Sequence, residues 1–272
     1  MNYPYTHRIN PINLDCQVEI RKGVSLFHGS ILNTNPDRKP PPKRGKIKGF
    51  SQRSRNRLRI QLFSLNEAPS HFITLTYPSV WPGDPAEWKR HLDNFTKALL
   101  HRFPGSWFFW KLEPQPKRKA PHYHLLGRVV LDGMPSVLFR SWLSSTWFRI
   151  VGSGDINHLR AGTQVKVVKD TSRRQLNYYV SKYLGKDIDL TSSPGWEVPG
   201  RFWGKFGGLP SSPSLVVDLD RSQYCQLRRL LRRWIRAQGR KSLHFSKRLA
   251  FIASFHVIIP WNISVQLIDF IT

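Results

Sequence analysis

The chain has 272 residues, which is enough for one substantial domain with extensions or for two small domains. Hydrophobic residues make up 40% of the sequence and include 10 Trp and 16 Phe, which excludes a chain that is disordered throughout. Lys and Arg number 43 against 17 Asp and Glu, and the resulting formal charge of +26 favours nucleic acid as the partner, with or without chemistry.

The cysteines and the N-terminal residues indicate the expected compartment. Cys16 and Cys225 have no paired spacing, so they offer neither a disulfide framework nor a zinc cluster. The N-terminal stretch lacks the basic start and the apolar run of a secretory signal. We therefore expect a cytoplasmic protein.

Composition divides the chain into four expected parts. Residues 1–50 show little periodicity and close on a run of Pro and Lys, which is typical of a flexible basic arm. The other parts are a globular domain over 51–215, a basic helix over 216–248 and a hydrophobic C-terminal tail over 249–272.

The globular part is expected to start with a basic amphipathic helix over 51–65. A β-branched and aromatic run, HFITLTY (71–77), predicts a strand. A helix is expected over 85–103, because a proline stands in the first turn and large apolar residues recur at helical spacing.

Two strand-like runs follow, SWFFWKLE (106–113) and HYHLLGRVVL (122–131), joined by a loop of prolines and basic residues that suits an exposed hairpin. A helix over 135–150, an alternating strand over 163–169 and a helix over 171–186 complete the series. This order predicts an α+β fold in which helices pack on one antiparallel sheet.

The first candidate site lies on the expected hairpin. Strand alternation places His122 and His124 on one face, and Glu113 ends the preceding strand. Two imidazoles and a carboxylate leave open positions on a cation, as a catalytic site requires, and donors without thiolate suit Mg²⁺ or Mn²⁺. Gln115 is the competing third ligand. The alternative is that the histidines are polar residues of a strand face and that Glu113 forms a surface salt bridge.

The second candidate site lies on the last helix of the globular part. Tyr179, Lys182 and Tyr183 stand at i, i+3 and i+4 and form one stripe. A phenol ordinarily ionises near pH 10, so its attack on a phosphate needs help, which Lys182 could give by stabilising the phenolate or orienting the phosphate. The alternative is an aromatic stripe that packs into the core. Tyr178 points about 100° around the helix, and we expect it to be a packing residue.

Three segments, FITLTY (72–77), PHYHLL (121–126) and YVSKYLGK (179–186), resemble in this order the three motifs of the HUH endonuclease superfamily. The tandem tyrosines, with WKLEPQ before the histidines and GRFWGK after the tyrosines, are similar to the replication initiators of rolling-circle plasmids and small single-stranded DNA phages. The resemblance implies an HUH endonuclease domain over 51–215, with a ferredoxin-like or RRM-like antiparallel sheet that carries the histidines on a central strand.

The resemblance also implies a metal-dependent endonuclease and strand transferase that nicks single-stranded DNA at a replication origin. Tyr179, by position, would attack the scissile phosphate, forming a 5′-phosphotyrosyl link and freeing a 3′-hydroxyl that primes synthesis. Tyr183 would be the second nucleophile. The stretch from Glu113 to His122 is longer than the family pattern, which leaves the third ligand open between Glu113 and Gln115.

Basic side chains of the first helix, of the hairpin loop and of the residues around and after the tyrosines are expected to contact the DNA: Arg53, Arg55, Arg57, Lys117, Arg118, Lys119, Lys186 and Arg201. The sequence holds no P-loop motif, so we expect no nucleotide cofactor. Unwinding and synthesis would then need a host helicase and a host DNA polymerase.

The C-terminal part leaves several alternatives open. Residues 224–241 alternate apolar and basic positions at helical spacing, which favours a helix on the DNA backbone over a docked helix or a membrane-surface helix. Residues 249–272 are long enough for a membrane span, but polar residues and Pro260 interrupt them, so C-terminal strands or a docked tail are favoured and membrane association is not expected. Alternatives for the whole chain are an HUH transposase or relaxase and a non-catalytic nucleic-acid-binding protein.

Overall fold

The computed structural model describes residues 16–29, 47, 49–169, 176, 178–185, 188, 196, 200–237, 255–257 and 259–272. The chain divides into two compact units. The first unit comprises Met1–Pro41, Leu62–Asn66 and Ser211–Thr272, and the second comprises Pro42–Gln61 and Glu67–Pro210.

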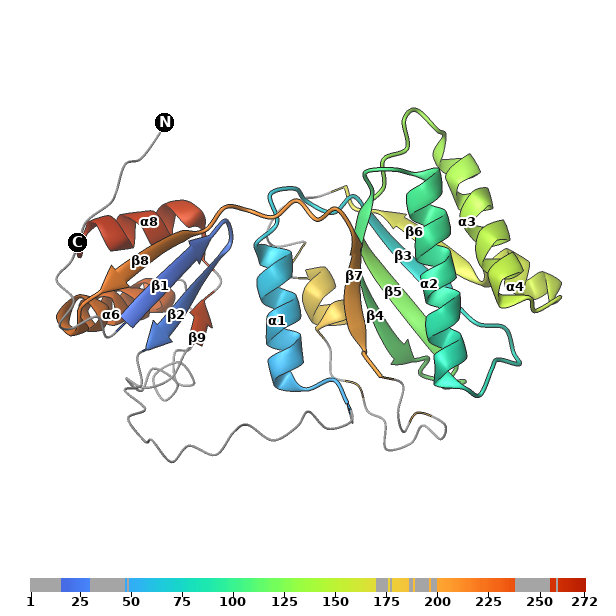
Figure 1. Cartoon of the computed structure of the whole chain (residues 1–272), viewed down its shortest axis with the longest axis horizontal. Coiled ribbons are helices and arrows are strands. Elements are labelled where there is room, and N and C mark those ends of the chain that lie inside the picture. The colour runs from blue at the N-terminus through green and yellow to red at the C-terminus, as the bar shows by residue number, and fades with distance from the viewer. Residues whose placement is uncertain are drawn as a thin grey trace. The chain divides into compact units, whose positions relative to one another are not determined.

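The second unit is built on a five-stranded antiparallel sheet with the strand order β6-β3-β5-β4-β7 (Figure 1). Its strands are β3 (His71–Thr76), β4 (Trp107–Pro114), β5 (Pro121–Arg128), β6 (Thr163–Val167) and β7 (Trp203–Gly207). The three central strands, β3, β5 and β4, are rich in aromatic and apolar residues and are largely buried, as strands covered on both faces are.

Three helices cover one face of this sheet: α2 (Pro85–Arg102), α3 (Ser136–Val151) and α4 (Ile156–Ala161) (Figure 1). Helix α2 begins after Asp84, whose side chain accepts a hydrogen bond from the backbone N–H of Ala86 at 2.8 Å. Tyr123 of β5 donates its hydroxyl to the Trp88 carbonyl at 3.0 Å, so the odd-numbered residues of β5 face α2. Aromatic residues therefore dominate this core.

Helix α1 (Gln52–Phe63) and a short π-helical turn, η1 (Val180–Leu184), lie on the other face. The Gly185 N–H donates to the Val180 carbonyl, the spacing of a widened helical turn. Phe72 of β3 and His124 of β5 both contact the ring of Tyr183, so the even-numbered residues of these strands face η1. This face carries the polar side chains discussed below.

The first unit has its own four-stranded antiparallel sheet, in the order β8-β1-β2-β9, and two helices. Its elements are β1 (Cys16–Arg21), β2 (Val24–Gly29), β8 (Leu215–Leu219), α6 (Arg221–Ala237), β9 (Phe255–Val257) and α8 (Trp261–Asp269). Alternate residues of β1, such as Val18 and Ile20, share one core with Leu227 and Leu231 of α6 and with Ile268 of α8. The helices thus pack on one face of this sheet.

The predicted α+β fold with antiparallel strands and packed helices is confirmed. The expectation of one sheet was wrong, because a second sheet forms within the first unit. Its strands β1 and β2 lie in the predicted flexible arm, where the short alternation of Cys16, Val18 and Ile20 stands beside long stretches without periodicity. Most of the Pro- and Lys-rich run lies outside the described residues.

The C-terminal predictions have mixed outcomes. The basic helix is confirmed as α6, and the tail contributes α8 and β9 where it is described. Within the part of the chain that the structure describes, no helix is both long enough and apolar enough to cross a membrane.

Candidate active site

Three side chains with metal-binding groups lie together where β4 and β5 pair. Glu113 stands opposite His122 in the register, and His124 follows two residues later, so strand alternation turns all three toward the η1 face. One ligand atom from each residue lies within 4.8 Å of the other two. His124 Nε2 is 2.9 Å from Glu113 Oε1. The hairpin therefore brings together the three residues that the sequence suggests as ligands.

His122 has surroundings that favour a metal ligand. Both ring nitrogens are buried, and neither has a hydrogen-bond partner among the residues that the structure describes. Burial, followed by the charge of the neighbouring His124, lowers the pKa of His122 to about 4. The imidazole is therefore neutral near pH 7, with a lone pair available to a cation. A buried polar atom without a partner is otherwise costly.

Glu113 remains ionised in this setting. Burial alone would raise its pKa, but the hydrogen bond with His124 and the charge of Lys111 outweigh burial and lower the pKa of Glu113 to about 2. Lys111 Nζ lies 2.6 Å from Glu113 Oε2 and donates to the backbone carbonyl of Tyr183 at 2.8 Å. Lys111 is fully buried and ties the carboxylate to η1. The sequence analysis missed Lys111, although strand alternation from Glu113 places it on the same face.

Gln115, the competing third ligand, lies in the loop between β4 and β5. Its Oε1 accepts a hydrogen bond from Arg118 Nε at 2.9 Å. The same guanidinium donates to the backbone carbonyls of Pro78 at 2.8 Å and Tyr77 at 3.1 Å. These contacts favour Glu113 as the third ligand, and they use donors of Arg118 within the protein.

The donor set fits a divalent cation. Two imidazole nitrogens and one carboxylate oxygen, without thiolate, suit Mg²⁺ or Mn²⁺ and would leave coordination positions for phosphate oxygens. His124 Nδ1 lies 3.4 Å from the hydroxyl of Thr74, while Nε2 points to Glu113. Such a contact on the second ring nitrogen orients the imidazole.

An aromatic cluster joins this hairpin to η1. Phe72 of β3 stacks on His124 with ring centroids 5.4 Å apart, and its ring lies 5.3 Å from Tyr179 and 4.6 Å from Tyr183. The ring of Tyr183 is 5.4 Å from that of His124 and 6.1 Å from that of Tyr179. Tyr179 is buried and Tyr183 is half-buried. Both expected nucleophiles therefore lie beside the metal-binding side chains.

Lys182 interacts with Tyr178, which the sequence analysis treats as packing. Lys182 Nζ donates to the Tyr178 hydroxyl at 2.6 Å, and it lies over the rings of Tyr178 and Tyr183, 5.0 Å and 5.4 Å from their centroids. The side of η1 that meets the sheet is taken by Tyr179, so Tyr178 is 46% exposed, and the packing expectation was wrong. The hydrogen bond from Lys182 lowers the pKa of Tyr178.

The residues expected to contact DNA occupy several places on the second unit. Four have exposed side chains, on α1, at the β4–β5 loop and just before β7: Arg53, Arg57, Lys117 and Arg201. Arg55 instead donates to the Gln52 side chain and the Phe50 carbonyl, at 2.8 Å and 3.3 Å. Lys119 has a left-handed φ of 60° in the hairpin loop, and Lys186 lies outside the described residues.

Comparisons with known proteins give the chain its relatives. Residues 70–188, which contain β3, the hairpin and η1, match the model of the ORF2 family of replication-associated proteins. The chain is 26% identical over 235 residues to a replication-associated protein of Pseudomonas phage Pf3, covering 80% of this chain and 81% of that protein. No solved structure matches.

Proposed function

Because residues 70–188 place this chain with the ORF2 family of replication-associated proteins, as a rolling-circle replication initiator, we propose that it nicks single-stranded DNA at a replication origin through a tyrosine. The observation that carries the proposal is the packing of Tyr179 and Tyr183 around Phe72, whose ring also stacks on His124. A nucleophile and a metal-binding cluster on one sheet face suit phosphodiester chemistry.

The first exchange follows from the side chains present. The phenolic oxygen of Tyr179 forms a bond to phosphorus while the bond to the 3′ oxygen breaks. The phenol gives up a proton and the departing oxygen takes one, so no water is consumed. A divalent cation held by Glu113, His122 and His124 would supply a Lewis acid for the charge on the phosphate oxygens. The cation of Lys182 would help to orient the phosphate.

The second tyrosine suits the end of a replication round. Tyr183 would cleave the regenerated origin and leave a second covalent link, and the free 3′-hydroxyl would then attack the first phosphotyrosine. Each exchange keeps one phosphodiester bond for every bond broken, so nicking and joining use the same groups. The 3′ end left by the first cleavage would serve a host DNA polymerase, with a host helicase opening the duplex.

Covalent adduct formation tests the proposal. The full chain is incubated with Mn²⁺ and single-stranded DNA carrying the origin of its own replicon, and the product is analysed by denaturing electrophoresis and by mass spectrometry of the linked peptide. We expect a 5′-linked adduct at Tyr179, lost in Tyr179→Phe, while Tyr183→Phe still makes the first cleavage. Salt-sensitive binding without an adduct in the wild type would instead identify a non-catalytic binding protein.

A further inference from the structure

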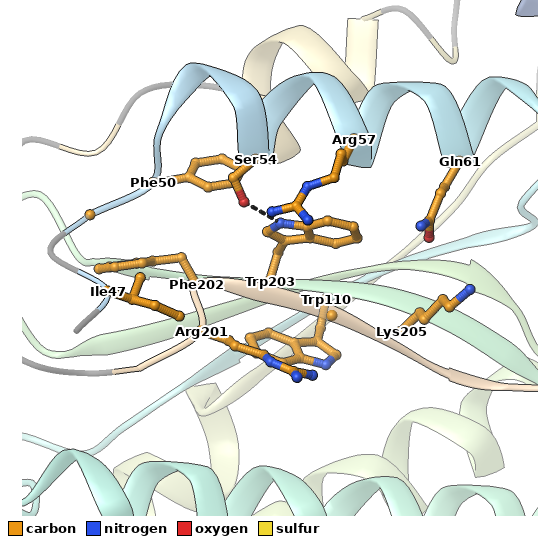
Figure 2. Close-up of a pocket in the computed structure, with 12 residues that line it drawn as sticks. Ile47, Phe50, Ser54, Arg57, Gln61, Trp110, Arg201, Phe202, Trp203 and Lys205 are labelled. Carbon is orange, nitrogen blue, oxygen red and sulfur yellow. Dashed lines mark hydrogen bonds between the residues drawn. The ribbon is translucent and has the colours of Figure 1, made fainter. Parts of the chain in front are cut away.

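A pocket of about 450 Å³ lies at the edge strand β7 of the five-stranded sheet, lined by residues of α1, β4 and β7 (Figure 2). Its volume falls within the range of about 300–1,000 Å³ that ligand sites occupy. The pocket lies within the second unit and contains none of the metal-binding residues or tyrosines.

Trp203 is the central side chain of this pocket. Its indole N–H donates to the Ser54 hydroxyl of α1 at 2.7 Å, which fixes the orientation of the ring beneath Arg57 (Figure 2). The ring is only half-buried, so part of its surface remains open to a ligand. Trp203 pairs with Lys111 across β4 and β7, and paired residues share a sheet face. The pocket therefore adjoins the face that carries Glu113.

A second indole approaches the same strand from the opposite face. Trp110 pairs with Gly204, and a Cβ at Gly204 would come within 2.7 Å of Trp110 Cε2 and Nε1. Because glycine leaves this space, the Trp110 ring lies across β7 and reaches the pocket, as Figure 2 shows. Any larger residue at position 204 would displace the indole.

The polar groups of the pocket are suited to a polyanion. Arg57, Lys205 and Arg201 line it and are exposed, and no carboxylate is among its described lining residues. The Oε1 atom of Gln61 is buried, and it has no hydrogen-bond partner within the described part of the chain. An unpaired amide oxygen in a pocket can accept a hydrogen bond from a ligand amine or imide.

We propose that this pocket binds one unpaired nucleotide of the single-stranded DNA, with its base stacked on Trp203, its phosphates near Arg57 and Lys205, and its base edge at Gln61. Indole faces combined with cations form the usual stacking platform for single strands, and stacking tolerates every base. The base edge is within reach of Gln61 only in an unpaired strand. The inference rests on the proposed function for the identity of the DNA, but it requires no cleavage.

Binding without divalent cations tests the pocket separately from nicking. The ligands are a fluorescent oligothymidylate and an abasic oligomer of the same length and charge, measured by anisotropy in EDTA at a salt concentration that weakens general phosphate contacts. We expect the wild type to prefer the thymidylate. Trp203→Leu should lose about 5- to 150-fold of that preference, whereas Trp203→Phe should keep most of it.

Matched controls separate the pocket from general effects. Trp142→Leu removes another half-buried indole, on α3, and should leave the preference unchanged. Lys205→Gln should weaken both ligands equally, and Lys97→Gln, an exposed change on α2, should weaken them less. Circular dichroism establishes that each variant is folded. If Trp203→Leu is unfolded, Gln61→Leu tests the base contact: it should reduce the preference without changing abasic binding.

Equal affinity of the folded wild type for thymidylate and abasic strands would overturn the pocket, and so would a preference that survives in folded Trp203→Leu. Either result is independent of the adduct assay with Mn²⁺. An adduct without base preference would leave the nickase and remove the pocket. Base preference lost in Trp203→Leu without any adduct would leave the pocket and remove the nickase.

Discussion

The two faces of the five-stranded sheet both carry buried histidines, yet they use them differently. On the face covered by α2, α3 and α4, each histidine has a protein partner. His71 Nδ1 lies 2.7 Å from the Ser70 hydroxyl, and His91 Nδ1 lies 3.1 Å from the Tyr77 hydroxyl. His158 contacts the Thr76 carbonyl at 2.9 Å through Nε2. These rings complete a packed core.

On the η1 face, His122 has neither nitrogen paired within the described residues, and His124 points Nε2 at a carboxylate. Residue type and burial are similar on both faces, so neither marks the site. What differs is whether the polar atoms are satisfied by the protein. Buried polar atoms that lack partners indicate where a ligand belongs, and satisfied atoms indicate structure.

The largest expected effect contrasts one histidine from each face. His122→Ala should lower nicking at least about 100-fold, because the several kcal/mol that a metal ion contributes to phosphoryl chemistry would be lost. His91→Ala should leave nicking within a few fold but lower the free energy of unfolding by about 1–3 kcal/mol, because the Tyr77 hydroxyl loses its partner. Adduct kinetics and denaturant unfolding measure the two effects. The reverse pattern would contradict the division between the faces.

Metal addition should sharpen the same contrast without any DNA. Mn²⁺ at about 100 times its dissociation constant should stabilise the wild type by about 2.7 kcal/mol, since only the folded hairpin assembles the ligands. His122→Ala should show little of this shift, and His91→Ala should show all of it. EDTA should reverse the shift. A metal-induced shift that persists in His122→Ala and His124→Ala would place the ion elsewhere.

Lys89 offers a smaller test, on the helix-covered face. Burial lowers its pKa from 10.5 to about 7, and its ammonium lies 4.6 Å from the Trp110 ring centroid. The unfolded chain therefore binds more protons than the folded chain between about pH 7 and pH 10.5, so stability should rise with pH over that window. Lys89→Met should flatten the rise, which would appear as a change of a few degrees in the melting temperature. Equal pH profiles for both proteins would contradict a buried ammonium.

Much of the second unit follows from patterns in the sequence. The strands β3, β4 and β5 and the helices α2 and α3 have clear periodicity, and alternation alone places His122 and His124 on one face. Strand β7 does not follow, because WGKFG is short and holds two glycines, and only its pairing with β4 makes it a strand. The pocket at β7 depends on that pairing and was invisible in the sequence.

The missed residues share a physical reason. Lys111 acts through contacts with Glu113 and with the Tyr183 carbonyl, and the second contact joins segments that lie 72 residues apart. Phe72 likewise gains its role by touching residues of β5 and η1. Local periodicity predicts the face on which a side chain lies, but it does not predict which distant segment will cover that face.

The smallest expected effect concerns Tyr178, the exposed phenol on the η1 side. Its hydroxyl accepts a hydrogen bond from Lys182, which lowers its pKa, but its ring is 46% exposed and does not contact Phe72 in the way that Tyr179 does. Tyr178→Phe should therefore change the nicking rate by no more than roughly two- to threefold, as surface substitutions usually do.

An ultraviolet titration makes this last comparison specific. The wild type should contain one phenol that ionises below the ordinary range near pH 10, and Tyr178→Phe should lack it, because Lys182 then has no phenolate to stabilise at that position. Tyr179→Phe should keep the early ionisation and lose the adduct. If Tyr178→Phe abolished the adduct while Tyr179→Phe retained it, the exposed phenol would be the nucleophile. Burial against Phe72 would then mark a packing residue on this face, as the satisfied histidines do on the other.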